Sequence, residues 1–220
     1  MDFYHVLNRG VDKRNIFLDG RDRARFVHDL YEFNDTKAAN NTLHRSQHND
    51  LRSRYVEIPR EKIVDIHGWC LMNNHYHLLL SERVDGGIVK FIRRLNIGYA
   101  KYFNERYKRT GTLFQGRTKK ILIKSDGHFL HILHYIHLNP LDYLPQATSW
   151  REHKLSNATN AFAHLEKYRW SSFLDYVGNP NFPSIITPNF FADFFGNYRK
   201  EILHYLHDIE ISNIKNFLLE

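Results

Sequence analysis

Cysteine is almost absent from this sequence, which holds only Cys70 among its 220 residues. One thiol cannot form an internal disulfide, and it argues against a zinc site built from cysteines. Such a composition fits a reducing compartment, so we expect a cytoplasmic protein. The first residues lack a charged-then-apolar signal pattern, and no apolar run approaches the roughly 18 residues that a membrane span needs. We therefore expect no membrane partner.

Proline is scarce as well, with 6 residues, while 42% of the residues are hydrophobic and 25% are charged. These proportions are typical of a folded protein and not of a disordered or fibrous one. The length suffices for one core, or for a domain with an appendage. We predict one domain over residues 1–145, with a polar insertion without hydrophobic period at 35–61, and a helical C-terminal extension over 146–220.

Acidic residues are almost missing from one long segment. Residues 87–124 hold eleven Lys or Arg and one acid, Glu105, for a local charge of +10, so the rest of the chain sums to −3. A charge run can be no more than a solvated helix face. Clustered basic residues also supply the counterion release on which nucleic-acid affinity depends, and we favour a phosphate-binding surface.

Hydrophobic periodicity predicts the order of the elements. Strands are expected at 3–8, 62–71, 75–82 and 119–124, and helices at 19–34, 88–107 and 126–139. Asp19 or Asp22 would cap the first helix, and Pro140 would end the third. The order β-α-β-β-α-β-α indicates an α+β fold with a ferredoxin-like antiparallel sheet. Beyond residue 145 the patterns indicate helices and no strand.

Two histidines share one side of the third predicted strand. In NNHYHLLL, His75 and His77 are two residues apart, so they point the same way while Tyr76 points the other way. Two imidazoles at this separation can chelate a divalent ion. With 15 histidines in the chain, chance alone gives roughly one such pair. Two structural histidines at a strand end remain an alternative.

A polar stripe follows the last predicted helix of the domain. In HFLHILHYIHLN the apolar side holds Leu133 and Ile136, while His131, Tyr135 and Asn139 fall on the opposite side. A tyrosine hydroxyl beside an amide oxygen could place a nucleophile next to a metal ligand. The alternative is a polar stripe that faces solvent.

Several motifs together resemble one protein family. MNNHYHLLL followed downstream by YIHLNP is similar to the single-tyrosine HUH transposases, and most like the REP-associated tyrosine transposases, which are DNA-nicking proteins of bacteria. YHVLNRG near the start, GTLFQGR before the fourth strand and RWSSF at 169–173 agree with this resemblance. Asn73 departs from it, because proline is common there, and the 35–61 stretch is longer than in most relatives.

The resemblance implies a role for each matching residue. His75 and His77 would be metal ligands, Asn139 would complete the metal site, and Tyr135 would be the nucleophile. The tyrosine would attack single-stranded DNA beside a small hairpin, leaving a 5′-phosphotyrosine and a free 3′-OH. The cofactor would be a divalent metal, Mg or Mn, because such a ligand set does not select the ion by itself. Monomer and homodimer are both compatible with the family.

The predicted DNA contacts come from two places. Asn8 and Arg9 lie in the motif near the start and would touch the hairpin substrate. The basic segment supplies the expected phosphate binders, which are Arg93, Arg94, Arg117, Lys119 and Lys120.

Two other functions fit parts of the pattern. A ferredoxin-like sheet with aromatic residues and basic loops also describes non-catalytic nucleic-acid-binding modules. A metal-dependent nuclease could use water as its nucleophile, and Tyr135 would then be dispensable.

Overall fold

The computed structural model describes residues 1–37, 60–124, 126–152, 155 and 157–207. Its first part follows the predicted order, with bounds β1 (Phe3–Arg9), α1 (Gly20–Glu32), β2 (Val64–Leu71), β3 (His75–Glu82), α3 (Gly87–Arg106), β4 (Lys119–Leu122) and α4 (Asp126–Leu138). Most of the predicted insertion, residues 38–59, lies outside the described part of the chain. The order β-α-β-β-α-β-α is confirmed.

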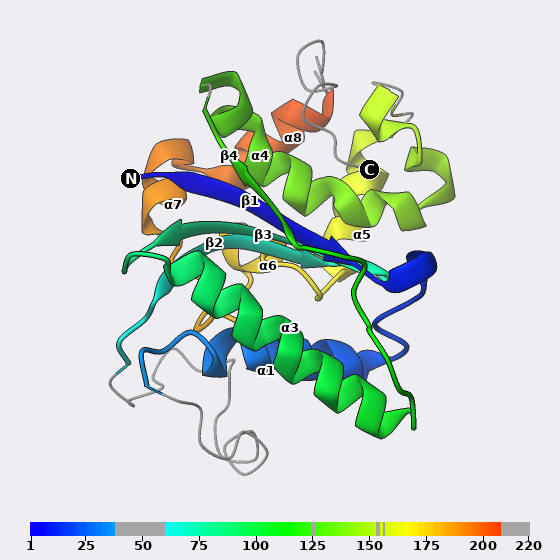
Figure 1. Cartoon of the computed structure of the whole chain (residues 1–220). Helices are drawn as coiled ribbons and strands as arrows, with labels where there is room; N and C mark the ends of the chain where they lie inside the picture. The colour runs from blue at the N-terminus through cyan, green and yellow to red at the C-terminus, as the bar shows by residue number, and fades with distance from the viewer. Residues whose placement is uncertain (38–59, 125, 153–154, 156, 208–220) are drawn as a thin grey trace.

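The strands form one four-stranded sheet in the order β2-β3-β1-β4, and every neighbouring pair is antiparallel. This is the ferredoxin-like arrangement predicted from the sequence. All residues of β2 are buried, and so are those of β3 apart from its two ends. The two central strands β3 and β1 therefore run through the middle of the protein, between two layers of helices (Figure 1).

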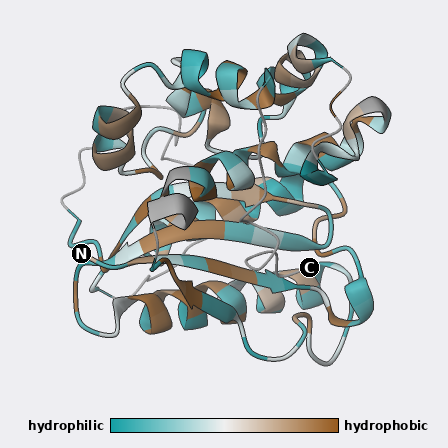
Figure 2. Ribbon diagram, turned by 90° about the horizontal axis from the view of Figure 1, so that it is seen from above, coloured by the Kyte–Doolittle hydropathy of each residue, from teal (hydrophilic) through white to brown (hydrophobic). Residues whose placement is uncertain are grey.

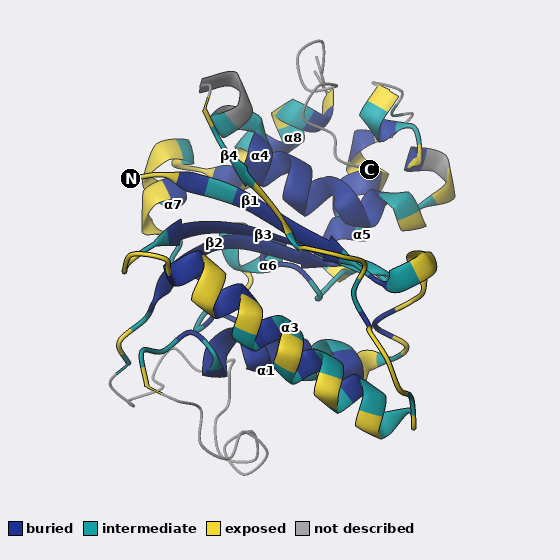
Figure 3. Ribbon diagram, in the orientation of Figure 1, coloured by how far each residue is buried: buried dark blue, intermediate teal, exposed yellow. Residues whose placement is uncertain are grey.

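The alternation of side chains along β3 divides the interior into two cores. Tyr76, Leu78 and Leu80 pack with α1 and α3 on one face of the sheet. Leu79, on the other face, packs with α4 and the C-terminal helices. Figure 3 shows α3 with its buried side toward the sheet and its exposed side toward solvent, and Figure 2 shows brown and teal turns mixed along the helices. Such mixed faces are typical of amphipathic helices that cover a sheet.

A partly buried ion-pair network joins the start of α1 to the end of α3. Asp19 is the N-cap of α1 and accepts hydrogen bonds from the backbone N–H groups of Arg21 and Asp22, as expected for this residue type. Asp22 is wholly buried and contacts Arg106 at 2.5 Å, while Arg106 also contacts Asp19 at 2.6 Å. The capping role predicted for Asp19 is confirmed, whereas the Asp22 side chain links the two helices.

The chain does not leave the helical conformation at Pro140. After α4 ends at Leu138, the 3₁₀ turns Asn139–Tyr143, Pro145–Ala147 and Trp150–Glu152 follow one another. Proline is tolerated there because it lies in the first turn, where its missing N–H needs no partner. The predicted helix end is correct to one residue, but the 3₁₀ turns bring Trp150 and Arg151 back beside α4.

The remaining helices cover the outer side of α4. They are α5 (Ala158–Lys167), α6 (Phe173–Tyr176), α7 (Asn189–Phe195) and α8 (Tyr198–His207). Their buried residues share one core with α4 and with Phe3, Cys70 and Leu79 of the sheet. Within the described residues, no helix is long and apolar enough to cross a membrane. The division of the chain at residue 145 stays a prediction, since residues on both sides of it contribute to this core.

We expect Arg106→Met to lower the free energy of unfolding by about 3 kcal/mol, because the buried Asp22 carboxylate loses its charged partner. Urea unfolding followed by circular dichroism measures this change. Arg93→Met is the matched control, since Arg93 is exposed on the same helix, and it should change stability by less than about 0.5 kcal/mol. Equal losses in the two variants would contradict the importance of the network.

Candidate functional site

The register of the sheet sets out a row of side chains on the α4 side. His77 pairs with Leu7 of β1 and with Cys70 of β2, and Leu7 in turn pairs with Lys119 of β4. Directly paired residues lie on the same face of a sheet. His77 and Lys119 therefore lie on one face, two strands apart. His75 follows on the same face, where it pairs with Arg9.

Both histidines of β3 are held through the same ring nitrogen. His77 Nδ1 lies 2.9 Å from His5 Nε2, with the two rings stacked, and His75 Nδ1 lies 2.6 Å from Asn74 Oδ1. A histidine that ligates a metal through one nitrogen usually uses the other for a hydrogen bond that fixes the ring. This orientation suits ligation through Nε2 in both residues.

Burial keeps these imidazoles neutral. It lowers the pKa of His75 to about 4, where the negative charge of Asp142 opposes the shift and the positive charge of Arg151 adds to it. Burial also places the pKa of His77 well below its usual range, and the neighbouring His75 and His5 lower it further. A neutral imidazole has a lone pair, so both side chains are in the form that binds metal ions at neutral pH.

Tyr135 faces the histidines from α4, and Asn139 follows at the start of the next 3₁₀ turn. The Tyr135 ring centroid lies 5.7 Å from that of His77 and 5.9 Å from that of His5, in edge-on contacts. Tyr135 is 6% exposed and Asn139 is fully buried. The alternative of a stripe facing solvent is therefore wrong at both positions, because the sheet covers this side of α4. The structure thus brings together residues that are far apart in the sequence.

The amide of Asn139 has a fixed orientation. Its Nδ2 donates a hydrogen bond to the backbone oxygen of Tyr135 at 2.9 Å, and its Oδ1 accepts one from Arg151 Nη2 at 2.7 Å. Arg151 also forms an ion pair with Asp142, whose carboxylate accepts a hydrogen bond from Trp150 Nε1. A carbonyl oxygen has two lone pairs, so Asn139 Oδ1 can accept this bond and still ligate a metal.

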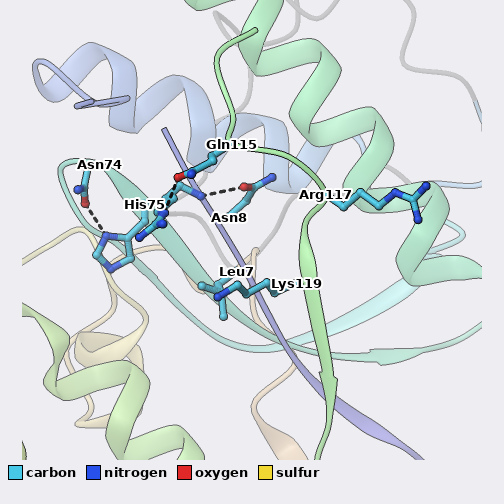
Figure 4. A pocket seen from close by; sticks show the side chains of 8 residues that line it. Leu7, Asn8, Asn74, His75, Gln115, Arg117 and Lys119 are labelled. Atoms are coloured by element: carbon cyan, nitrogen blue, oxygen red, sulfur yellow. Dashed lines mark hydrogen bonds between the residues drawn. The ribbon is translucent and has the colours of Figure 1, made fainter. Parts of the chain in front are cut away.

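A pocket of about 300 Å³ opens beside His75, lined by Leu7, Asn8, Arg9, Asn74, His75, Gln115, Arg117 and Lys119. Arg9 donates a hydrogen bond through Nε to Gln115 Oε1 at 2.7 Å. Figure 4 shows His75 at one end of the pocket and Arg117 at the other. Of the predicted DNA contacts, Arg9, Arg117 and Lys119 thus line the same pocket as His75.

Three of the predicted DNA contacts lie outside this pocket. Arg93 and Arg94 are on α3, below the opposite face of the sheet (Figure 1), and Arg94 donates a hydrogen bond to the backbone oxygen of Asp35. Lys120 pairs with Val6, so it points to the α3 side, where its Nζ lies 4.4 Å from the Tyr4 ring centroid.

Asn8 lines the pocket, but its side chain is buried and donates a hydrogen bond to Thr118 Oγ1 at 3.0 Å. The DNA-binding roles of these residues, and of those in the pocket, stay predictions.

The turn that carries the histidines is tied to other parts of the chain. Asn73, the departure from the family pattern, accepts a hydrogen bond from Arg23 Nη2 at 2.6 Å through Oδ1. Its backbone N–H donates to the Tyr143 hydroxyl at 2.7 Å. The turn is therefore fixed by α1 on one side and by the 3₁₀ turns after α4 on the other.

Four residues of the site were not predicted from the sequence. They are His5, Gln115, Asp142 and Arg151. His5 could have been suspected, because alternation along FYHVLNR puts it on the same face as Arg9. Asp142 and Arg151 gave no such signal, since they belong to turns that the sequence pattern does not define.

The donor set predicted for the site does not select one metal ion by itself. Within the described residues, no group of three or more His, Cys, Asp or Glu side chains is arranged to hold a metal. The predicted set is different, with two neutral imidazoles and the amide oxygen of Asn139. Such a set leaves coordination positions open for the oxygens of a substrate.

Residues 34–139, just under half of the chain, match the family described as "Transposase IS200 like". This part of the chain is therefore similar to a transposase family. That family is the IS200-like one, and the matched segment includes His75, His77, Tyr135 and Asn139, so the predicted resemblance to transposases is confirmed. The fold is similar to a solved structure described as "Structure of the REP associates tyrosine transposase bound to a REP hairpin", with 12% identity, 83% of each chain covered and a TM-score of 0.44. No curated protein matches the sequence.

The outer side of α4 is held by a second group of histidines. His137 lies 2.8 Å from both the Tyr198 hydroxyl and Ser172 Oγ. The ring of His134 packs on Tyr205, with centroids 4.5 Å apart, and on Phe195 at 5.0 Å. In the described part of the chain neither ring nitrogen of His134 has a hydrogen-bond partner. Burial, with a smaller effect of His131, lowers the pKa of His134 to about 3.

We expect His134→Phe to reduce the acid sensitivity of folding. Between pH 6.5 and 3 an unfolded histidine binds a proton that the folded His134 does not bind, so stability is lost as the pH falls. At pH 5 this one residue should account for a loss of about 2 kcal/mol. Urea unfolding at pH 7 and pH 5 measures it. His207→Gln is the control, because His207 is exposed at the end of α8. Equally steep acid destabilisation in wild type and His134→Phe would contradict the assignment.

Proposed function

We propose that this protein is a metal-dependent endonuclease and strand transferase for single-stranded DNA, a transposase whose nucleophile is Tyr135. The edge-on contact of the Tyr135 and His77 rings, 5.7 Å apart between centroids, carries the proposal. It brings a phenol from α4 to a pair of neutral imidazoles on β3. Nucleophilic attack beside a metal uses this combination of groups.

The reaction follows from the groups of the chain. The Tyr135 hydroxyl loses its proton and its oxygen attacks the scissile phosphorus, forming the O–P bond of a 5′-phosphotyrosine. The bond from phosphorus to the 3′ oxygen breaks, and that oxygen takes up a proton to become a 3′-OH. The phosphodiester energy is conserved in the covalent link, so attack by a 3′-OH can rejoin a strand without ATP.

His75 and His77 would hold a divalent metal ion through Nε2, and Asn139 would add its Oδ1. When bound, the ion polarises the phosphate and stabilises the charge that develops on it. The amide oxygen, with the oxygens of a phosphate, suits Mg or Mn, so one of these ions is the proposed cofactor. The contacts of His5 and Asn74 orient the two rings, and Trp150 packs on Tyr135 with centroids 5.9 Å apart.

The pocket beside His75 is the proposed path of the DNA strand. Arg9, Arg117 and Lys119 line it, and their charges can pair with consecutive phosphates. The family resemblance of the motifs supports hairpin-bearing single-stranded DNA as the substrate. Arg93, Arg94 and Lys120 would then contact DNA only if it also wrapped around the α3 side.

Tyr135→Phe should abolish formation of a protein–DNA adduct while DNA binding survives. The assay uses hairpin-bearing single strands labelled at either end, with Mg or Mn, followed by denaturing gels. Tyr143→Phe is the matched control, because Tyr143 presents its hydroxyl at the histidine-bearing turn and is 37% exposed. An adduct that persists in Tyr135→Phe and disappears in Tyr143→Phe would indicate that Tyr143 is the nucleophile. Cleavage without any adduct would indicate a nuclease that uses water, and binding without cleavage would indicate a binding module.

Two consecutive lysines of β4 test the DNA path, because they point to opposite faces of the sheet. In the Tyr135→Phe background, Lys119→Gln should weaken binding of a labelled hairpin strand and reduce the slope of log K against log salt by roughly 0.7 to 0.9. Lys120→Gln should change the slope much less. Fluorescence anisotropy over a salt series measures both, and a larger effect at Lys120 would place the strand on the α3 side.

A further inference from the structure

Arg151 holds the oxygen of Asn139 that the proposed metal would use. Its Nη2 donates to Asn139 Oδ1 at 2.7 Å, and its Nη1 binds the Asp142 carboxylate. The guanidinium lies 4.4 Å from the Trp150 ring centroid and 5.8 Å from that of Tyr135. Its side chain is 19% exposed. A positive charge is therefore fixed inside the site, against the predicted nucleophile and one predicted ligand.

This charge also acts on the other two ligands. The positive charge of Arg151 disfavours a positive charge on His75 and on His77, while the Asp142 carboxylate favours one on His75. A divalent ion bound to the histidines would be repelled by Arg151 and attracted by Asp142, and its double charge would double both interactions. The guanidinium is permanently charged, so its effect does not depend on pH.

We propose that Arg151 is a positioning residue that makes metal binding depend on DNA. In the DNA-free protein it shares Asn139 Oδ1 with the metal site and opposes the binding of a dication. The scissile phosphate relieves this opposition. The proposal rests on the proposed function, since it takes His75, His77 and Asn139 as the ligands. A bound phosphate would supply the negative charge that both cations lack. Guanidinium groups pair well with phosphate oxygens, so Arg151 would then turn part of its hydrogen bonding to the substrate.

In this proposal the binding of metal and the binding of DNA are thermodynamically linked. If DNA raises the affinity of the protein for metal by some factor, metal raises the affinity for DNA by the same factor. The result would be a site that stays weakly loaded until a strand is present. Removing the charge of Arg151 should then strengthen metal binding by the DNA-free protein and reduce the coupling, two changes that damage to the fold would not produce.

The test titrates Mn²⁺ into the full-length protein and follows unbound Mn²⁺ by electron paramagnetic resonance, so it needs no activity. In Arg151→Met, the Mn²⁺ affinity without DNA should rise by about tenfold or more, as expected for a nearby charge at an effective dielectric constant of about 20. Arg151→Lys keeps the charge and should stay close to the wild type. Asp142→Asn should bind Mn²⁺ more weakly than the wild type, because it removes the favourable anion.

The matched control is Arg199→Met. Arg199 makes the same kinds of contact on the C-terminal helices, an ion pair with Glu166 at 2.7 Å and a ring contact with Phe162 at 4.7 Å. Its replacement should leave Mn²⁺ affinity unchanged. Thermal unfolding of each variant identifies one that has failed to fold. If Arg151→Met fails to fold, the separate variants Arg151→Lys and Asp142→Asn still test the charge effect.

A second titration adds a hairpin-bearing single strand in the Tyr135→Phe background. The strand should raise the Mn²⁺ affinity of the protein with Arg151 at least several-fold, and raise that of the Arg151→Met form less. No rise with Arg151 present would overturn the dependence on DNA.

His77→Ala separates this inference from the proposed function. If His77→Ala abolishes Mn²⁺ binding while Arg151→Met leaves its affinity unchanged or lowers it, the metal site stands and the role of Arg151 is overturned. If His77→Ala binds Mn²⁺ as well as the wild type does, with and without the strand, the metal site itself is overturned. Opposite signs for Arg151→Met and Asp142→Asn would establish the electrostatic role.

Discussion

Strand β3 is the element on which the site depends, because it lies between β1 and β2 and pairs with both along its length. A shift of one residue would turn His75 and His77 into the core below the sheet. Tyr76 opposes this shift. Its ring lies 4.9 Å from that of Phe26 and its hydroxyl donates to Asn96 Oδ1 at 2.8 Å, both on the α1–α3 side. The large residue between the two histidines thus fixes which way they point.

Helix α4 needs a fixed rotation as much as β3 needs a fixed register. Tyr135 and His137 are about 200° apart around a helix, so they face opposite sides. The contacts of His137 with Tyr198 and Ser172 hold the outer side against the C-terminal helices. With that side held, Tyr135 faces His77. The C-terminal helices therefore contribute to the site without providing any of its predicted ligands.

Much of this arrangement could be predicted from local sequence patterns. Alternation placed His75 and His77 on one face, and the helical period placed Tyr135 and Asn139 on one side of α4. The nonlocal parts could not be predicted. The pairing register that brings His5 to His77 is set by contacts across 72 positions. Arg151 returns to Asn139 through 3₁₀ turns, whose short length leaves no hydrophobic period in the sequence.

The net charge of a segment says less about which charged residues reach the pocket than the position of each residue in the fold. Arg106 belongs to the +10 segment, but its charge is committed to Asp19 and Asp22. Alternation along β4 sends neighbouring lysines to opposite faces, so only part of the segment reaches the pocket. At the centre of the site the histidines are neutral, and Arg151 is a fixed cation beside them. In the proposed function a phosphate would complement such a site, because it would meet the arginine and a metal ion at the same time.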